Sequence, residues 1–255
     1  MVAVTVLALT PDTRRPVDTA TLAAAARTAG FIALGMVSGR FEAGDAAVLA
    51  GAGLRCHELL GLQIGPDPSA TIAAAERLAE DAASLDAPWV LTTFVVEPGG
   101  AVDAVVARCA ALFDAAGSGM AIEFSPLGPV ATIADGLAAV AAAGSARAAL
   151  VIDSWNFCFG ASTWDDLERV PLESIAYLQF ADALAPLGEA TFEEAMTRRA
   201  LPGDGILELE RFATTMRSRG WDGVVSLQVL SDELRSLPVA EYVRRVHAAA
   251  EPYWL

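Results

Sequence analysis

Short apolar runs and alanine-rich helical stretches alternate along the whole chain, and this alternation limits the fold more than any other feature. Eight runs have the length and composition of strands. They cover residues 3–9, 31–36, 54–60, 89–94, 120–124, 148–153, 175–180 and 224–229. Helical stretches lie near residues 18–29, 44–51, 69–84, 101–115, 131–143, 162–168, 207–219 and 239–250. Eight strands alternating with eight helices over 255 residues predict an α/β fold, a (β/α)₈ barrel.

Three further patterns favour a single barrel domain over residues 1–255. The predicted strands are apolar on both faces, as parallel strands covered by helices are. Gly30 follows the first predicted helix and Gly220 precedes the last predicted strand, positions at which glycine commonly ends a helix. Residues 181–205 are too many for a simple turn. Their Pro, Gly, Glu and paired Arg residues predict a loop insertion over the barrel mouth.

The charge of the chain narrows its partners and its chemistry. The net charge is −15, which argues against binding to nucleic acids or to anionic membranes, so a small-molecule substrate is the expected partner. All 17 basic residues are Arg. The lack of Lys excludes Schiff-base aldolase chemistry, a lysine-anchored pyridoxal phosphate and a P-loop lysine. Self-association into a homo-oligomer stays open.

Histidines, cysteines and apolar segments set further limits. His57 and His247 are the only two histidines, so a three-histidine zinc site is excluded. Cys56, Cys109 and Cys158 are too few and too scattered for a disulfide framework or a zinc site. No apolar run reaches the roughly 18–20 residues that span a bilayer. The first ten residues lack the basic start and the cleavage site of a signal peptide. A cytoplasmic location is therefore expected.

Polar side chains stand at or near the C-terminal ends of four consecutive predicted strands, where the active site of such a barrel lies. The four residues are Glu123, Asp153, Gln179 and Gln228. Alone, each has an ordinary explanation, because a carboxylate can cap a helix and a strand Gln can be a satisfied core amide. Together, two buried carboxylates need a cation, an Arg or a shared proton. Asp182 follows its strand and is more simply explained as a loop cap.

Several segments in the second half resemble one family in order and spacing. They read "AIEF", "VIDSWN", "YLQFAD", "RRALPGDG" and "GWDGVVSLQVLSDELR" and span residues 119–235. They resemble the xylose isomerase-like TIM barrels, the superfamily of sugar phosphate isomerases/epimerases and endonuclease IV. The resemblance implies a TIM barrel with a divalent metal at its mouth, held by Glu, Asp, His and Glu on the last four strands. The stretch "LQFADA" is similar to the 3-dehydroshikimate dehydratase branch.

Carried over residue by residue, the resemblance assigns the metal ligands to Glu123, Asp153, Gln179 and Gln228. A histidine near the substrate falls on Asn156, and the substrate-contacting Arg falls on Arg199. The last strand thus carries Gln where the family carries Glu. Of the two glutamates that trade protons in the epimerases, only Glu123 remains. Because an amide cannot act as a general base, a two-glutamate epimerase is not expected.

The chemistry of the donors leaves two kinds of site open. Glu123, Asp153, Gln179 and Gln228 offer only oxygen, which suits Mg²⁺ or Mn²⁺ in a weak site and disfavours zinc. The alternative is a site without metal, in which Glu123 and Asp153 share a proton or pair with an Arg.

Other side chains extend the set of substrate-binding candidates. An aromatic-rich loop is predicted after Asp153. In it, Asn156 is expected to bind or orient substrate through its amide, and Trp155 to make the pocket aromatic. His57 and Glu58 supply an acid or a base if they reach the mouth. Strand alternation sends neighbouring side chains to opposite faces, so at most one of the two is expected to point into the barrel.

Three hypotheses for function follow. The first is an isomerase or a dehydratase-like lyase that acts on a carbonyl-bearing polyol, sugar or cyclic keto acid by proton transfer. Glu123 and Asp153 are its catalytic residues, and a weakly held divalent metal assists. The second is a metal-free enzyme of the same fold with another proton-transfer reaction. The third is a non-catalytic barrel that binds a ligand or a related active subunit.

Overall fold

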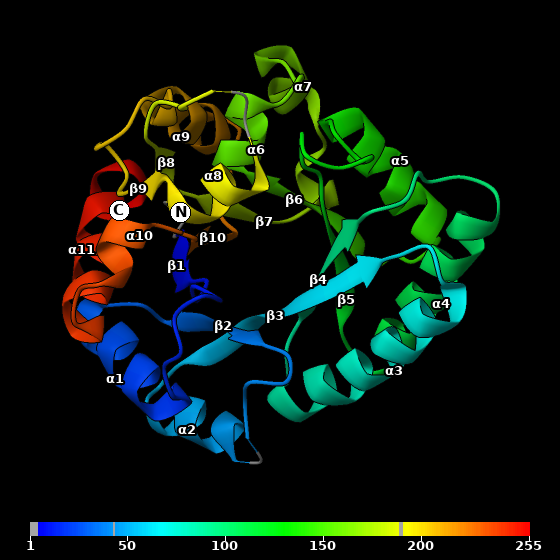
Figure 1. Ribbon diagram of the computed structural model, residues 1–255, viewed down its shortest axis with the longest axis horizontal. Coiled ribbons are helices and arrows are strands. Elements are labelled where there is room, and N and C mark those ends of the chain that lie inside the picture. The colour runs from blue at the N-terminus through cyan, green and yellow to red at the C-terminus, as the bar shows by residue number, and fades with distance from the viewer. Residues whose placement is uncertain (1–4, 43, 189–190) are drawn as a thin grey trace.

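The computed structural model describes residues 5–42, 44–188 and 191–255. Eight parallel strands close into a barrel in the order β1-β10-β7-β6-β5-β4-β3-β2, and Figure 1 looks along this barrel with the helices around it. The strands are β1 (Val6–Leu9), β2 (Ala33–Val37), β3 (Arg55–Ile64), β4 (Trp89–Phe94), β5 (Gly119–Glu123), β6 (Ala148–Asp153), β7 (Ile175–Phe180) and β10 (Val224–Leu227). The predicted (β/α)₈ barrel is confirmed. Residues 3–4 of the first predicted strand lie outside the described residues.

The outer layer consists of the eight helices that the alternation predicted. They are α1 (Thr19–Ala29), α2 (Asp45–Gly51), α3 (Pro68–Leu85), α4 (Ala101–Ala115), α5 (Ile133–Ala143), α7 (Trp164–Arg169), α9 (Leu209–Ser218) and α11 (Val239–Trp254). Local sequence sets their ends. Asp67 caps α3 through the N–H groups of Ser69 and Ala70, and Gly30 ends α1 in the left-handed region at φ 108°. None of the helices among the described residues combines the length and the apolar character that crossing a bilayer requires.

Shorter elements at the ends of the strands were not predicted as such. α6 (Ser154–Phe159) directly follows β6, where the aromatic-rich sequence predicted a loop. α10 (Asp232–Arg235) precedes α11, and a 3₁₀ turn (Leu172–Ser174) precedes β7. A helix of one or two turns has too few residues to display an apolar period, so α6 and α10 give no pattern in the sequence.

The predicted insertion after β7 is confirmed and has its own structure. It contains β8 (Asp182–Ala183), α8 (Phe192–Thr197) and β9 (Arg199–Ala200), with β8 and β9 paired antiparallel. Figure 1 shows α8 and β9 drawn over one side of the barrel end. Asp182 accepts hydrogen bonds from the N–H groups of Gly203, Gly205 and Leu207 at 2.9–3.1 Å, which confirms its predicted role as a loop cap.

A cluster of polar side chains lies inside the barrel. Glu58 is fully buried and accepts hydrogen bonds from Thr10 Oγ1 and Tyr177 OH, both at 2.5 Å. His57 Nε2 lies 3.2 Å from Glu58 Oε1 and 2.9 Å from Ser226 Oγ. Burial raises the pKa of Glu58, but the charge of His57 and the hydrogen bonds that Glu58 accepts outweigh burial. The pKa of Glu58 therefore lies below its ordinary value.

His57 and Glu58 both point into the barrel, so the expectation that at most one would do so is wrong. The pairing of β2 with β3 shifts by one residue here, since Leu34 pairs with Cys56 but Gly35 pairs with Glu58. His57 is the extra residue of a β-bulge, which interrupts the alternation of side chains. Gly35 leaves the space that the Glu58 carboxylate occupies.

We predict that Gly35→Ala destabilises the barrel. A methyl group at Gly35 would lie 2.7 Å from Glu58 Oε1 and 3.1 Å from Pro11 Cδ. Overpacking of this kind lowers the free energy of unfolding by about 1–3 kcal/mol, which urea denaturation measures. Gly51→Ala is the matched control, because its new methyl group would meet no atom within 4 Å. Equal free energies of unfolding for the two variants would contradict this prediction, because they would show that the Glu58 side chain moves to make room for the methyl group.

A second prediction concerns acid stability. Because the pKa of Glu58 is lowered in the folded state, its carboxylate stabilises the fold above the ordinary glutamate pKa of 4.5 and loses this effect as the pH falls below it. The stability difference between wild type and Glu58→Gln should thus be largest near neutral pH and shrink on acidification. Unfolding in urea at a series of pH values measures this difference. The exposed Glu80→Gln variant serves as control, and a difference independent of pH would refute the assignment.

Candidate functional site

Asp153, at the end of β6, engages both carboxylate oxygens in strong contacts. Its Oδ1 accepts from the N–H groups of Trp155 at 2.6 Å and Asn156 at 3.1 Å, which caps α6. Its Oδ2 lies 2.6 Å from Arg199 Nη1, and both side chains are buried. Asp153 is therefore a helix cap and the anion of a buried ion pair at the same time.

Arg199 comes from β9, within the insertion, and is held by the main chain on two sides. Its Nε donates to the carbonyl of Ala195 at 3.1 Å, and its Nη1 also reaches the carbonyl of Gln228 at 3.5 Å. The guanidinium lies 5.8 Å from the centre of the Trp155 ring. The sequence predicted a substrate contact for Arg199. The structure instead places its guanidinium against Asp153, with 4% of the side chain exposed.

Glu123, at the end of β5, is half-buried and is held through one oxygen. Asn156 Nδ2 donates to Glu123 Oε1 at 3.0 Å. The Gln179 amide lies between the two carboxylates. With its nitrogen toward them it donates to Glu123 Oε1 at 3.1 Å and to Asp153 Oδ2 at 3.2 Å, whereas its oxygen there would face only acceptors. No described residue donates a hydrogen bond to Glu123 Oε2.

The surroundings of Glu123 bring its titration close to neutral pH. Burial raises the pKa of Glu123, and the negative charge of Asp153 raises it further. The positive charge of Arg199 and the hydrogen bond from Asn156 act in the opposite direction. The pKa is about 8, which makes the group able both to accept and to donate a proton near neutral pH.

Gln228 follows β10 and lines a cavity of about 610 Å³ at the mouth of the barrel. The floor of this cavity includes Leu60 and Leu91, and Phe192 and Met196 of α8 line it too. Of the four predicted metal-site residues, only Gln228 lines this cavity. All four residues lie at or near the C-terminal ends of their strands, and the Gln179 amide lies between the carboxylates of Glu123 and Asp153.

None of the five predicted substrate-binding residues lines the mouth cavity: Asn156 and Arg199 make the contacts given above, and the other three are buried. Trp155 is 2% exposed and packs on Phe159 with ring centres 4.8 Å apart. α6 turns the Trp155 side chain into the protein, where the sequence analysis expected it to line the pocket. His57 and Glu58 are buried in the interior cluster, because the β-bulge directs both inward.

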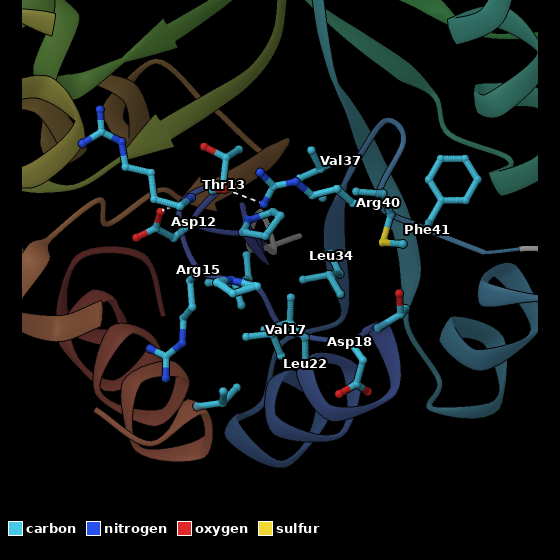
Figure 2. A pocket seen from close by; sticks show the side chains of 18 of the residues that line it. Asp12, Thr13, Arg15, Val17, Asp18, Leu22, Leu34, Val37, Arg40 and Phe41 are labelled. Atoms are coloured by element: carbon cyan, nitrogen blue, oxygen red, sulfur yellow. Dashed lines mark hydrogen bonds between the residues drawn. The ribbon is translucent and has the colours of Figure 1, made fainter. Parts of the chain in front are cut away.

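A second groove of about 850 Å³ adjoins the mouth cavity, and Pro11, Thr13 and Val37 line both. Figure 2 shows Leu22 and Leu34 within it, and Arg40, which donates to the Thr13 carbonyl. No sequence pattern indicated this groove, because its lining comes from separate strands, loops and helices. Its carboxylates are already engaged: Asp12 pairs with Arg235 at 2.7 Å, and Asp18 caps α1. The groove adds binding surface and no free acid or base.

The predicted Mg²⁺ or Mn²⁺ site does not fit the contacts of its donors. Asp153 Oδ2 already faces the Arg199 guanidinium at 2.6 Å, and Asp153 Oδ1 accepts hydrogen bonds from two N–H groups of α6. Within residues 5–42, 44–188 and 191–255, no group of three or more His, Cys, Asp or Glu side chains could hold a metal ion.

Comparison with known proteins relates this chain to one family. The sequence pattern described as "Xylose isomerase-like TIM barrel" matches residues 22–250. An inosose isomerase from Halalkalibacterium halodurans is 28% identical over 128 residues, which are 49% of this chain and 44% of the relative. The match thus spans less than half the length of that relative.

Solved structures share the fold at low sequence identity. A structure of the IOLI protein with a zinc atom superposes with a TM-score of 0.84 at 18% identity and covers 97% of each chain. A D-allulose 3-epimerase from Methylomonas sp. superposes with a TM-score of 0.74 at 11% identity and covers 98% of each chain. At these identities the similarity shows the fold alone.

We predict that the ion pair at the mouth is a major contributor to stability. Asp153→Asn leaves the guanidinium of Arg199 buried without its anion, which should lower the free energy of unfolding by about 3–5 kcal/mol. Asp165→Asn is the matched control, since Asp165 pairs with Arg169 on the surface with side chains 69% and 80% exposed. The control should change stability little. Similar effects of both substitutions, measured by urea unfolding, would contradict a buried pair.

Proposed function

Because this chain belongs to the xylose isomerase-like TIM barrel family, we propose that it is an isomerase that moves a carbonyl group along a polyol by proton transfer. The resemblance to an inosose isomerase supports a cyclic or open-chain hydroxy ketone as substrate. The solved epimerases of the same fold act on related hydroxy ketones, in keeping with this class.

The observation that carries this proposal is the state of Glu123. One oxygen is fixed by Asn156 and Gln179, so the carboxyl group has a defined orientation. The other oxygen accepts no hydrogen bond from the described residues, and the side chain is half-buried at the barrel mouth. A general base needs this combination of a fixed position, a free oxygen and a pKa near the working pH. With a pKa of about 8, Glu123 has all three.

One acid–base group is sufficient for a carbonyl shift between neighbouring carbons. The Glu123 carboxylate takes the proton from the hydroxyl-bearing carbon next to the carbonyl, which leaves an enediolate whose remaining hydroxyl proton passes to the former carbonyl oxygen. Glu123 then returns its proton to the former carbonyl carbon, and the other enediol oxygen becomes the new carbonyl. Atoms and charge balance without a second base. Inversion at a single carbon would need a group on the opposite face, and the residue that the family resemblance assigns to this role, Gln228, is an amide that cannot titrate.

The other residues of the mouth bind and orient in this scheme. Gln228 presents its amide to the mouth cavity and can donate to or accept from substrate oxygens. Asn156 acts on Glu123, not on the substrate, because its Nδ2 already donates to Glu123 Oε1. The buried positive charge of Arg199 offsets negative charge that develops on the enediol oxygens.

Exchange of substrate hydrogen with solvent tests this proposal. Wild-type protein in D₂O is incubated with a keto-inositol and with ketohexoses, and proton NMR follows the hydrogen next to the carbonyl. We expect deuterium incorporation and a positional isomer of the ketone. Glu123→Gln should reduce exchange by about 100-fold or more, the scale of a lost general base.

Glu97→Gln, an exposed glutamate on the β4–α4 loop, is the matched control and should exchange as wild type does. An unsaturated product with loss of water would reassign the reaction to elimination, which begins with the same proton abstraction. If Glu123→Gln exchanges hydrogen as fast as wild type, Glu123 is not the general base. No exchange with any of these ketones would count against the isomerase itself.

A further inference from the structure

The carboxylates of Glu123 and Asp153 lie near one buried guanidinium, that of Arg199, at the barrel mouth. The Gln179 amide lies between Glu123 and Asp153, 3.1 and 3.2 Å from their oxygens when its nitrogen faces them, and Arg199 Nη1 lies 2.6 Å from Asp153 Oδ2. A divalent ion bound between the carboxylates would use the same oxygen that the guanidinium occupies. Two cations at that distance from one oxygen would repel each other strongly in a buried site.

Both carboxylate oxygens of Asp153 already accept hydrogen bonds. Two N–H groups of α6 occupy Oδ1, and Arg199 and Gln179 occupy Oδ2. With the Gln179 oxygen toward the carboxylates, three oxygens surround one point, an arrangement that a cation stabilises. The positive charge of Arg199 already stands beside that point. Moving the Arg199 side chain away would leave the Asp153 carboxylate unpaired. It would also break the hydrogen bond from Arg199 Nε to the Ala195 carbonyl at 3.1 Å.

The chemistry of the two glutamines agrees with this arrangement. Gln179 and Gln228 are neutral, and each amide oxygen binds a divalent cation more weakly than a carboxylate does. As a hydrogen-bond donor, by contrast, the Gln179 amide suits two adjacent carboxylates well. The positive charge at the mouth is thus supplied by Arg199, while the amides of Gln179 and Gln228 supply hydrogen bonds.

We propose that the Arg199 guanidinium is the built-in cation of this barrel mouth and takes the place of a divalent metal ion. Arg199 is a positioning residue: it holds Asp153, and through Asp153 it holds α6 and the Asn156 side chain that orients Glu123. Because Arg199 lies on β9, the insertion over the mouth carries the charge on which the site depends. This inference concerns cation binding and stands independently of the proposed isomerisation.

Titration of the wild-type protein gives the first test. Chelated protein is titrated with Mn²⁺, Mg²⁺ and Zn²⁺ in a calorimeter, and elemental analysis measures the metal that remains after purification. We expect no saturable binding at the mouth and no stoichiometric metal. Stoichiometric metal binding to wild type that Asp153→Asn abolishes would overturn the proposal. This test leaves Arg199 unsubstituted.

A set of variants tests whether Arg199 is what excludes the metal. Gln179→His with Gln228→Glu restores a nitrogen and a carboxylate donor, and this double variant is compared with the triple variant that also carries Arg199→Met. We expect Mn²⁺ to bind the triple variant tighter than the double variant by on the order of tenfold or more, because one nearby positive charge is gone.

Arg219→Met in the same double variant is the matched control. Arg219 bonds the carbonyls of Leu167 and Val170, away from the mouth, so Mn²⁺ affinity should not change. Equal Mn²⁺ affinity of the double and triple variants, both folded by circular dichroism, would overturn the role of Arg199. If the triple variant does not fold, Arg199→Lys replaces Arg199→Met: it keeps the charge, so Mn²⁺ affinity should stay at the level of the double variant. Tighter binding in Arg199→Lys would count against charge as the cause.

The exchange reaction separates this inference from the proposed function. Retention of solvent exchange by chelated wild-type protein supports a metal-free mouth. Loss of exchange on chelation with recovery on addition of Mn²⁺ overturns it. Lack of exchange both with and without metal counts against the isomerase, and the binding titrations then decide the role of Arg199 alone.

Discussion

The buried ion pair between Asp153 and Arg199 is the contact on which the barrel mouth depends. It joins the end of β6 to the insertion that carries β9, two segments that are 46 positions apart in sequence. Asp153 also caps α6, so the same carboxylate sets the start of the helix that carries Asn156. Breaking a buried pair by removal of one partner costs far more than breaking a surface pair, because the remaining charge has no water around it.

This pair also shapes the acid–base chemistry of Glu123. With Asp153 neutralised by Arg199, Glu123 is the carboxyl group that remains available at the mouth. Burial and the charge of Asp153 raise its pKa, and two amides fix its orientation. A site with one carboxyl group that titrates near neutral pH suits the shift of a carbonyl between neighbouring carbons. Inversion at one carbon requires acid–base groups on both faces of the substrate.

The interior cluster around Glu58 shows a second way to bury a carboxylate. No Arg approaches it within the described contacts; His57, Thr10 and Tyr177 supply the hydrogen bonds instead. Two backbone features make this cluster fit, namely the bulge at His57 and the missing side chain at Gly35. The barrel is thus filled by polar groups whose geometry is set by main-chain irregularities, because a regular β3 would direct His57 away from Glu58.

The sequence by itself determined the barrel, the insertion after β7 and the set of residues at the ends of the last four strands. These follow from local properties, since apolar runs, helix stops and strand ends can be located without knowing the partners of any residue. The pairing of oxygens and nitrogens could not be predicted in this way. Whether Asp153 meets a metal or Arg199, and whether Trp155 faces the substrate or the core, depends on segments brought together only by folding. The tertiary structure decided these points, because a buried charge takes whichever partner the closed barrel places within about 3 Å.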